Sequence, residues 1–502
     1  MKKILFVFTA AVCISFTSCE KMLDVDSTRV VSDENMWAKM EDTRAGLLGI
    51  YALTKSALVD HNAFWLYGEV RTGEYAVPVR RDLMAIAQQD LNANDETLEA
   101  LRNWRRWYAV VNAANVFIAR APEVLQSDDR YKQANLNVDV AQARLLRAFA
   151  YFYMTRVWGD LPLITSSSEN NFINKPRESQ AKILAWVEQE LLETVPVLPL
   201  RYSVDEPEQL GNYYNEAQSR WDGAIATKIA AYALLAHVSA WQGNYPNVAS
   251  YTAFIMDNYE KANISYTATN NLTSPSGFFF DKHSSQMFAF PGVWAHLEGS
   301  FTGNIEELTL ATPVINKTIP DIYLTKETIV NVFNEAKDER FSIDTLGKPL
   351  NEDYFRNFNG RYPIFNKIKC IQGGNTDPTF QIFTSALVFS RLEDITLLRA
   401  EGLAVLGEQG GAIDLLNRIR ENRGLSNYSP ESNGDLLDAI FRERHRELMG
   451  EGHRWYDIVR YNRIKNNDPD FVERIRSGAI YWPISESVLH QNTLLEQNNY
   501  WK

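Results

Sequence analysis

The sequence has few of the residues on which disulfide-rich proteins and many metalloenzymes depend. Its 502 residues include three cysteines and seven histidines. Three cysteines cannot build a disulfide framework, and no HExxH, CxxC or paired-histidine spacing indicates a metal site. A phosphate-binding P-loop and a GxSxG nucleophile elbow are absent as well. We therefore predict a protein that is not an enzyme and that uses no cofactor, no metal and no catalytic residue.

Positive charge is also scarce. Lysine and arginine number 51 against 63 aspartate and glutamate residues, which gives a formal net charge of −12 at pH 7. A chain with this net charge is repelled by the phosphates of nucleic acid and by anionic lipid headgroups. We therefore expect no nucleic acid partner.

The first eighteen residues, MKKILFVFTAAVCISFTS, have the pattern of a secretory signal. Two lysines precede an apolar run from Ile4 to Ile14, which is too short to cross a bilayer as a permanent helix. Small residues then lead into Cys19, as in a bacterial lipobox. We predict a signal peptide over 1–18, lipidation at Cys19 and a lipid-anchored linker over 19–35. A cleaved and freely secreted protein is the alternative.

Apolar residues at spacings of three and four predict helices along much of the remaining chain. The predicted helices cover 36–56, 97–120, 136–158, 180–194, 222–242, 247–259, 390–406, 411–423 and 435–449. Strand-like alternation is scarce, and no βαβ rhythm is present. We predict a mostly α fold in a single domain over 36–502, with irregular insertions at about 60–95 and 260–385. Long irregular segments in compact proteins are usually functional, so we expect the large insertion to carry the ligand face.

A weak internal repeat runs through the predicted helices. Gly159, Gly243 and Gly407 each follow an apolar helix, and after the latter two a second amphipathic helix begins. Glycine supplies the left-handed residue that ends a helix and lets the chain reverse. A helix, a glycine turn and a second helix make up the tetratricopeptide pattern, in which each pair buries its apolar face against a neighbour. We predict about four such helical hairpins.

The stretch RELMGEGHRWYDIVRYN combines many charged side chains with aromatic residues near the C-terminus. A glycosidase would need two carboxylates facing a cleft, without arginines to neutralise them. Here nearly every acid has a basic neighbour, and charges beside buried aromatics are tolerated when they are paired. We therefore assign the cluster a structural role. Its members are Arg446, Glu447, Glu451, Arg454, Trp455, Asp457 and Arg460.

This stretch also carries a family resemblance. The segment IFRERHRELMGEGHRWYDIVRYN resembles the C-terminal signature of the SusD/RagB family of outer-membrane nutrient-binding lipoproteins. Further segments resemble the family in the same order: LDVDSTRVVSDENMW, ARLLRAFAYFYMTRVWGDLPLI, DITLLRAEGLAVLG with AIDLLNRIRENRGL, and YWPISESVLHQNTLLEQNNYW. The likeness is least in 60–95 and 260–385.

The resemblance implies a fold, a location and a partner. The fold would be a helical body of four tetratricopeptide-like hairpins with an irregular face. The protein would be a lipid-anchored, cell-surface-exposed outer-membrane lipoprotein. It would cover a TonB-dependent (SusC-like) transporter and deliver a glycan to it.

Sugar recognition requires flat apolar rings together with planar polar side chains that reach hydroxyl groups. Two loop-like regions supply both kinds of side chain. One is His61 to Leu83, and the other is the stretch around FFF and FAFPGVWAH. A third candidate is LGNYYNEAQSRW. In the family, ligand contacts commonly come from the N-terminal region and from the insertion. The resemblance suggests Glu74 and Arg81 as ligand contacts in the N-terminal region. The predicted ligand-binding residues are Trp65, Glu74, Tyr75, Arg81, Asn103, Tyr213, Phe279, Trp294 and His296.

We therefore predict a surface lipoprotein that binds an oligo- or polysaccharide without chemistry. Uptake of peptides, which some members of the family bind, is an alternative within the same class. A glycoside hydrolase on a helical scaffold is an alternative of another class, because 63 carboxylates allow many arrangements. A tetratricopeptide scaffold that binds only protein is the third.

Overall fold

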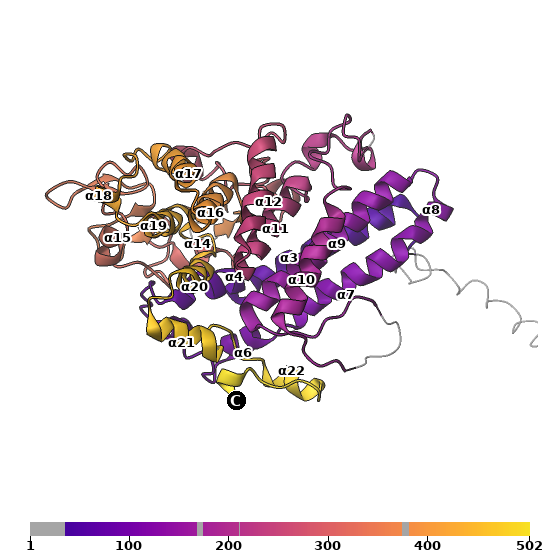
Figure 1. Cartoon of the computed structure of the whole chain (residues 1–502), viewed down its shortest axis with the longest axis horizontal. Helices are drawn as coiled ribbons and strands as arrows, with labels where there is room; N and C mark the ends of the chain where they lie inside the picture. The colour runs from indigo at the N-terminus through magenta and orange to yellow at the C-terminus, as the bar shows by residue number, and fades with distance from the viewer. Residues whose placement is uncertain (1–35, 168–173, 210, 374–380) are drawn as a thin grey trace, which may run out of the picture.

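The computed structural model describes residues 36–167, 174–209, 211–373 and 381–502. The predicted signal peptide over 1–18, the linker over 19–35 and Cys19 lie outside the described residues. Helices dominate the part that is described (Figure 1). None of the described helices combines the length and the apolar character needed to cross a membrane.

A continuous array of long helices forms the body of the protein. Along the array each helix contacts the next, from α3 through α7, α9, α10, α11, α12 and α16 to α17 and α19. Taken in pairs, α3 with α7, α9 with α10, α11 with α12 and α16 with α17 give four hairpins. The predicted mostly α fold with about four tetratricopeptide-like hairpins is therefore confirmed. These helices are α3 (Met40–Val59), α7 (Arg105–Arg120), α9 (Gln133–Trp158), α10 (Gln180–Thr194), α11 (Lys228–Gln242), α12 (Tyr245–Asn258), α16 (Leu392–Val405), α17 (Gln409–Glu421) and α19 (Leu436–Leu448).

Local sequence explains where these helices begin and end. The Thr227 hydroxyl accepts a hydrogen bond from the Ala230 amide at the start of α11, and the Ser179 hydroxyl caps α10 in the same way. Gly243 follows α11 with φ of 77° and so ends it in the left-handed conformation that glycine adopts without strain. Helix α9 is buried around almost its whole circumference in its second half, which places it at the centre of the array.

Residues 60–95 differ from the predicted irregular insertion. They form short helical elements, among them α4 (Ala63–Gly68), whose residues are all buried. The segment predicted as one helix over 97–120 is divided at Asn103 and Trp104 into α6 and α7. The remaining elements of this half are η1 (Asp60–Asn62), η2 (Val70–Thr72), α5 (Arg81–Ala87), α6 (Glu96–Arg102), η3 (Ala121–Glu123), α8 (Val124–Ser127), η4 (Tyr213–Asn215) and η5 (Gln218–Arg220).

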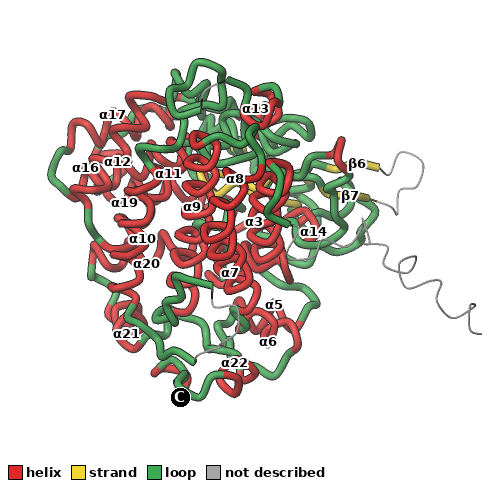
Figure 2. Tube along the Cα trace, turned by 90° about the vertical axis from the view of Figure 1, so that its right-hand side faces the viewer, coloured by secondary structure: helices red, strands yellow, loops and turns green. Residues whose placement is uncertain are grey.

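The large insertion is mostly loop with short helices and strands, and it gathers to one side of the helices (Figure 2). Its described strands pair antiparallel in four two-stranded sheets, β1 with β8, β2 with β3, β4 with β5 and β6 with β7. The helical elements are α13 (Thr269–Leu272), η6 (Trp294–His296), α14 (Ile305–Thr309) and α15 (Lys326–Val332). The strands are β1 (Phe288–Phe290), β2 (Ser342–Ile343), β3 (Pro349–Asn351), β4 (Phe355–Arg356), β5 (Ile364–Phe365), β6 (Ile371–Gly373), β7 (Gln381–Phe383) and β8 (Leu387–Ser390).

Strand β1 attaches this insertion to the helical body. The rings of Phe288 and Phe290 lie 5.0 and 5.8 Å from the ring of Phe149 on α9, measured between centroids. Phe389 on β8 meets the same ring edge-on at 5.0 Å. Edge-to-face contacts of this kind add to the hydrophobic burial of the rings, so the insertion is held by a shared aromatic core.

The C-terminal charged cluster lies inside the protein, around the junction of α19 and α20 (Arg454–Lys465). Glu447 has no exposed surface, and its carboxylate accepts hydrogen bonds from Arg340, Arg391 and Arg423 at 2.7–3.1 Å. Glu451 accepts from Arg391 at 2.8 Å. Each buried charge thus has a partner, which is the condition under which burial is tolerated. The elements that complete the chain are α18 (Pro430–Asn433), α20 (Arg454–Lys465), α21 (Pro469–Ser477), α22 (Glu486–Gln491) and η7 (Asn499–Trp501).

The other members of the cluster are paired as well. Asp457 accepts from Arg444 at 3.0 Å and lies 2.8 Å from Arg460, which also pairs with Glu401. Arg446 contacts Glu335 and donates to the Val332 carbonyl at 2.7 Å. This geometry agrees with a structural role for the cluster.

Two glycines make the turn between α19 and α20 possible. Gly450 and Gly452 have φ of 78° and 76°, a region that other residues enter only with strain. A Cβ on Gly452 would lie 2.5 Å from the ring of Phe64 on α4. The chain turns tightly here because α4 packs directly against the turn.

Candidate functional site

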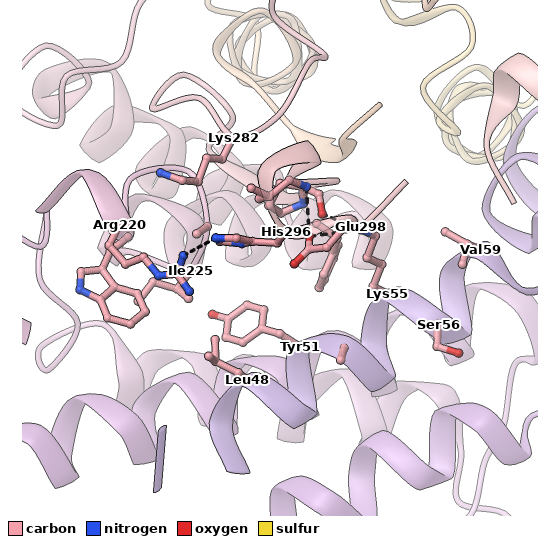
Figure 3. Close-up of a pocket in the computed structure, with 16 residues that line it drawn as sticks. Leu48, Tyr51, Lys55, Ser56, Val59, Arg220, Ile225, Lys282, His296 and Glu298 are labelled. Atoms are coloured by element: carbon pink, nitrogen blue, oxygen red, sulfur yellow. Dashed lines mark hydrogen bonds and ion pairs between the residues drawn. The ribbon is translucent and has the colours of Figure 1, made fainter. Parts of the chain in front are cut away.

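A cavity of about 580 Å³ lies between α3 and the large insertion. Helix α3 forms one wall with Leu48, Tyr51, Lys55 and Val59 (Figure 3). The volume falls within the range of small-molecule sites in proteins, roughly 300–1,000 Å³. We call it the α3 cavity. The segment after η5 contributes Arg220, Trp221 and Ile225, and the insertion contributes Lys282, Phe290, Pro291, Val293, His296 and Glu298.

Aromatic rings supply much of the apolar lining. Tyr51 and Phe290 approach with ring centroids 6.4 Å apart. The Tyr51 hydroxyl donates to Gln142 at 2.8 Å and accepts from the Ala226 amide at 2.7 Å, and burial raises its pKa. The Trp221 indole N–H donates to a backbone carbonyl at 3.1 Å. Because their polar atoms are already bonded inside the protein, these rings are fixed in place as apolar walls.

One end of the cavity carries Arg220, His296 and Lys282, which Figure 3 shows gathered together. The Arg220 Nη1 atom lies 2.9 Å from the His296 Nε2 atom. Arginine only donates, so the imidazole accepts through Nε2 in this contact. The Lys282 ammonium donates to the Ser219 carbonyl.

The other end carries Lys55 and Glu298. The Lys55 Nζ atom donates to the Pro291 carbonyl at 2.6 Å and lies 4.0 Å from Glu298. The Glu298 carboxylate also accepts from the Val293 amide at 3.0 Å. Burial lowers the pKa of Lys55, because it disfavours the charged ammonium, and Glu298 opposes this effect only in part.

A second cavity of about 410 Å³ lies between α19 and α20. Two of its lining residues, His445 and Arg454, both contact Glu74. Burial alone would raise the pKa of Glu74, yet the contacts with His445 and Arg454 lower it below its ordinary value. The carboxylate is therefore satisfied within the protein. This cavity offers less apolar surface than the α3 cavity for a sugar ring.

Four of the predicted ligand-binding aromatics belong to the core. Trp65, Tyr75, Tyr213 and Phe279 are 3%, 3%, 1% and 2% exposed. The Trp65 indole donates to the Gly450 carbonyl at 3.1 Å, and the Tyr213 hydroxyl donates to buried Asp139. Their rings present no face to solvent, so these four side chains are not available for the ligand contacts that were predicted for them.

Three further predicted residues lie apart from the α3 cavity. Glu74 is engaged by His445 and Arg454, as described above. Asn103 donates to the Ser487 hydroxyl at 3.2 Å, and Arg81 is exposed at the start of α5. None of the three is among the residues that line the cavity.

The insertion stretch FAFPGVWAH does reach the cavity. His296 lines it, and half-buried Trp294 lies on the same turn, η6. The wall that α3 supplies was not predicted, and the third candidate stretch, LGNYYNEAQSRW, reaches the cavity through Arg220 and Trp221 rather than through Tyr213. The SRW triplet was a usable signal, since it places a cation and an indole side by side in a loop.

Comparisons with known proteins agree with this architecture. A sequence model of the SusD family matches residues 348–501. A SusD-like protein of Formosa agariphila is 28% identical over 517 aligned positions, which cover 96% of this chain and 95% of that protein. A Bacteroides vulgatus protein whose name suggests sugar binding is 19% identical with a TM-score of 0.68, covers 92% of this chain and 99% of its own, and shares the fold.

A SusD superfamily protein from Bacteroides thetaiotaomicron gives a stronger match. Its crystal structure superimposes with a TM-score of 0.84, and the two sequences are 41% identical. The match covers 93% of this chain and 99% of that one. Likeness of this extent in sequence and in structure shows that the chain belongs to the SusD family.

Proposed function

We propose that this protein binds an oligo- or polysaccharide in the α3 cavity without chemistry. The observation that carries the proposal is the lining, in which the rings of Tyr51, Trp221 and Phe290 stand beside the donors of Arg220 and Lys282. Rings offer apolar surface to the face of a sugar, and the cationic donors reach its oxygen atoms. The Bacteroides vulgatus protein described above, whose name suggests sugar binding, supports the same ligand class.

The lining also favours binding over hydrolysis. Glycoside hydrolysis requires a pair of carboxyl groups about 5–10 Å apart across the scissile bond. Among the residues that line the α3 cavity, Glu298 is the one acid, and it accepts from the Val293 amide and lies near Lys55. A second carboxylate for acid–base chemistry is therefore not part of this wall.

The proposal extends to location and partner. The chain would be anchored in the outer membrane through an acylated Cys19, with residues 19–35 as a linker and 36–502 as one surface-exposed domain. It would deliver its glycan to a TonB-dependent, SusC-like transporter. Membership of the SusD family and the signal-like N-terminus support these steps.

The test is a binding survey with variants. Affinity electrophoresis across a polysaccharide panel, followed by calorimetry on the hits, should find at least one glycan that binds. Arg220→Ala should weaken that binding roughly tenfold or more, the loss expected for a charge-assisted hydrogen bond. Arg476→Ala, on the exposed face of α21, is the matched control.

Two results would contradict the proposal. The first is binding of a peptide mixture with no glycan retained, which would favour the peptide-binding alternative. The second is release of new reducing ends on incubation with the bound glycan, which would show a hydrolase. Loss of all glycan binding in Arg220→Ala with an unchanged melting temperature would support the α3 cavity as the site.

A further inference from the structure

We infer that the α3 cavity recognises an acidic saccharide unit, one that carries a carboxylate or a sulfate group. The inference rests on the proposed function, because it specifies the ligand of the same cavity.

The wall of the cavity has the opposite sign to the whole chain. Lys55, Arg220 and Lys282 are cations, and Glu298 is the one carboxylate among the lining residues. The chain as a whole carries a formal charge of −12. Positive charge concentrated in a concave site of an acidic protein raises the local concentration of anions. The positive charge of the wall would not raise the local concentration of a neutral sugar.

Two of the three cations are not neutralised. Within the described residues, neither Arg220 nor Lys282 lies within 4.0 Å of a carboxylate oxygen of Asp or Glu. Their bonding partners are the His296 imidazole and the Ser219 carbonyl, which carry no negative charge. The fully buried Arg340, Arg391 and Arg423, by contrast, are each paired with acids.

The third cation is only weakly balanced. Lys55 lies 4.0 Å from Glu298, at the outer limit of an ion pair, and its strongest contact is with the Pro291 carbonyl. Its lowered pKa shows that burial outweighs the influence of Glu298. An anion in the cavity would therefore stabilise the charged form of this lysine as well.

Geometry places the anionic group at the Arg220 end. Figure 3 shows the imidazole of His296 directed toward Arg220, with Lys282 on the same side. A guanidinium presents two parallel N–H donors that match a carboxylate or a sulfate, and an adjacent ammonium adds a point charge. The apolar rings of Tyr51 and Phe290 lie further along the wall, where the body of the sugar would rest.

A smaller hollow of about 290 Å³ continues from the cavity and shares Leu48, Arg220 and Trp221 with it. Its own cation, Arg44, pairs with Glu216 at 3.2 Å, and its second acid, Glu41, pairs with Arg130 at 2.8 Å, so these charges are balanced. The excess of positive charge is thus confined to the α3 cavity. We expect an acidic unit in the cavity and a neutral neighbouring unit in the hollow.

Matched pairs of ligands give the decisive experiment. Calorimetry would compare oligogalacturonate with its methyl ester, and sulfated carrageenan oligosaccharides with the chemically desulfated form, which is neutral, with neutral gluco-oligosaccharides as a third arm. We expect the acidic member of at least one pair to bind roughly tenfold or more tightly. Its affinity should fall as the salt concentration rises, since salt screens exposed charges. The two pairs distinguish a carboxylate from a sulfate.

Charge variants separate the inference from the proposed function. Lys282→Gln should lower the affinity for the acidic member by a larger factor than the affinity for the neutral member, and it should leave the melting temperature unchanged. Lys326→Gln, an exposed lysine on α15, is the control. Equal binding of both members, unaffected by Lys282→Gln, would overturn the acidic ligand and leave the proposed function standing. Failure of every glycan to bind would overturn both.

Discussion

Replacing Glu447 with glutamine tests whether the C-terminal charged cluster stabilises the fold. The substitution keeps the shape of the side chain and removes one negative charge at a site with no exposed surface. Burial alone would raise the pKa of Glu447, but Arg423, Arg391 and Arg340 hold it well below its ordinary value. The carboxylate is therefore ionised in the folded protein at neutral pH, and glutamine would leave three guanidinium groups short of a counter-charge.

The size of the loss in unfolding free energy depends on the acids that the three arginines still contact. Breaking one buried ion pair by removing a partner costs about 3–5 kcal/mol. The loss here is not three times larger, because Arg340 keeps Asp338 and Glu443, and Arg391 keeps Glu451. We expect Glu447→Gln to lower the free energy of unfolding by about 3–5 kcal/mol, a large share of the roughly 5–15 kcal/mol typical of a folded domain.

Urea denaturation followed by tryptophan fluorescence and far-ultraviolet circular dichroism measures this loss. Glu473→Gln is the matched control, because its partner Arg476 on α21 is 78% exposed in its side chain and the pair contributes little. A loss below about 1 kcal/mol for Glu447→Gln, comparable with the control, would refute the structural role assigned to the cluster.

Three further predictions test other parts of the structure. Burial raises the pKa of Glu69 to about 8, so its stabilising effect is complete below the unfolded-state pKa and is lost as pH rises towards 8. The free energy of unfolding of Glu69→Gln should therefore rise relative to that of the parent as the pH increases from 5 to 9, by a few kcal/mol. Urea titrations at each pH measure this gain, and a difference between the two proteins that does not change with pH would contradict the prediction. Gly452→Ala should lower the melting temperature, since it adds strain at φ of 76° and a clash with Phe64. Trp65→Ala should cost about 3–5 kcal/mol of stability and leave glycan affinity unchanged in protein that remains folded.

The helical body could be predicted from sequence because its signals are local. The segment predicted over 180–194 coincides with α10, and Gly243 ends α11 as its sequence context indicates. Periodicity, caps and glycine turns act within a few residues and need no knowledge of the rest of the chain. The break at Asn103 and Trp104 escaped this reasoning, because apolar spacing continues across it.

The ligand-binding aromatics were harder to predict, because burial depends on distant partners. Trp65 lies in a segment rich in aromatic and charged residues, yet α4 places it under the turn at Gly450, 385 positions away in the chain. Tyr213 is likewise buried by its contact with Asp139. Composition identifies a ring but does not show which face of it is covered.

The α3 cavity was missed for a related reason. Lys55 and Tyr51 lie one turn apart on what reads as an ordinary amphipathic helix, and nothing local distinguishes them from surface and core residues. They become a wall only because the insertion brings Phe290 and Pro291 against α3. The site is therefore a product of tertiary contact between two parts of the chain that are more than two hundred residues apart.

The same contact links the cavity to the charged cluster. Phe290 forms part of the cavity wall and pairs in β1 with Leu387 of β8, and β8 runs directly into Arg391. Arg391 is in turn fixed by Glu447 and Glu451. A ligand site holds its geometry when the residues behind it are themselves rigid. The buried ion pairs thus do more than stabilise the helices, because they also set the position of the strand that closes the cavity against α3.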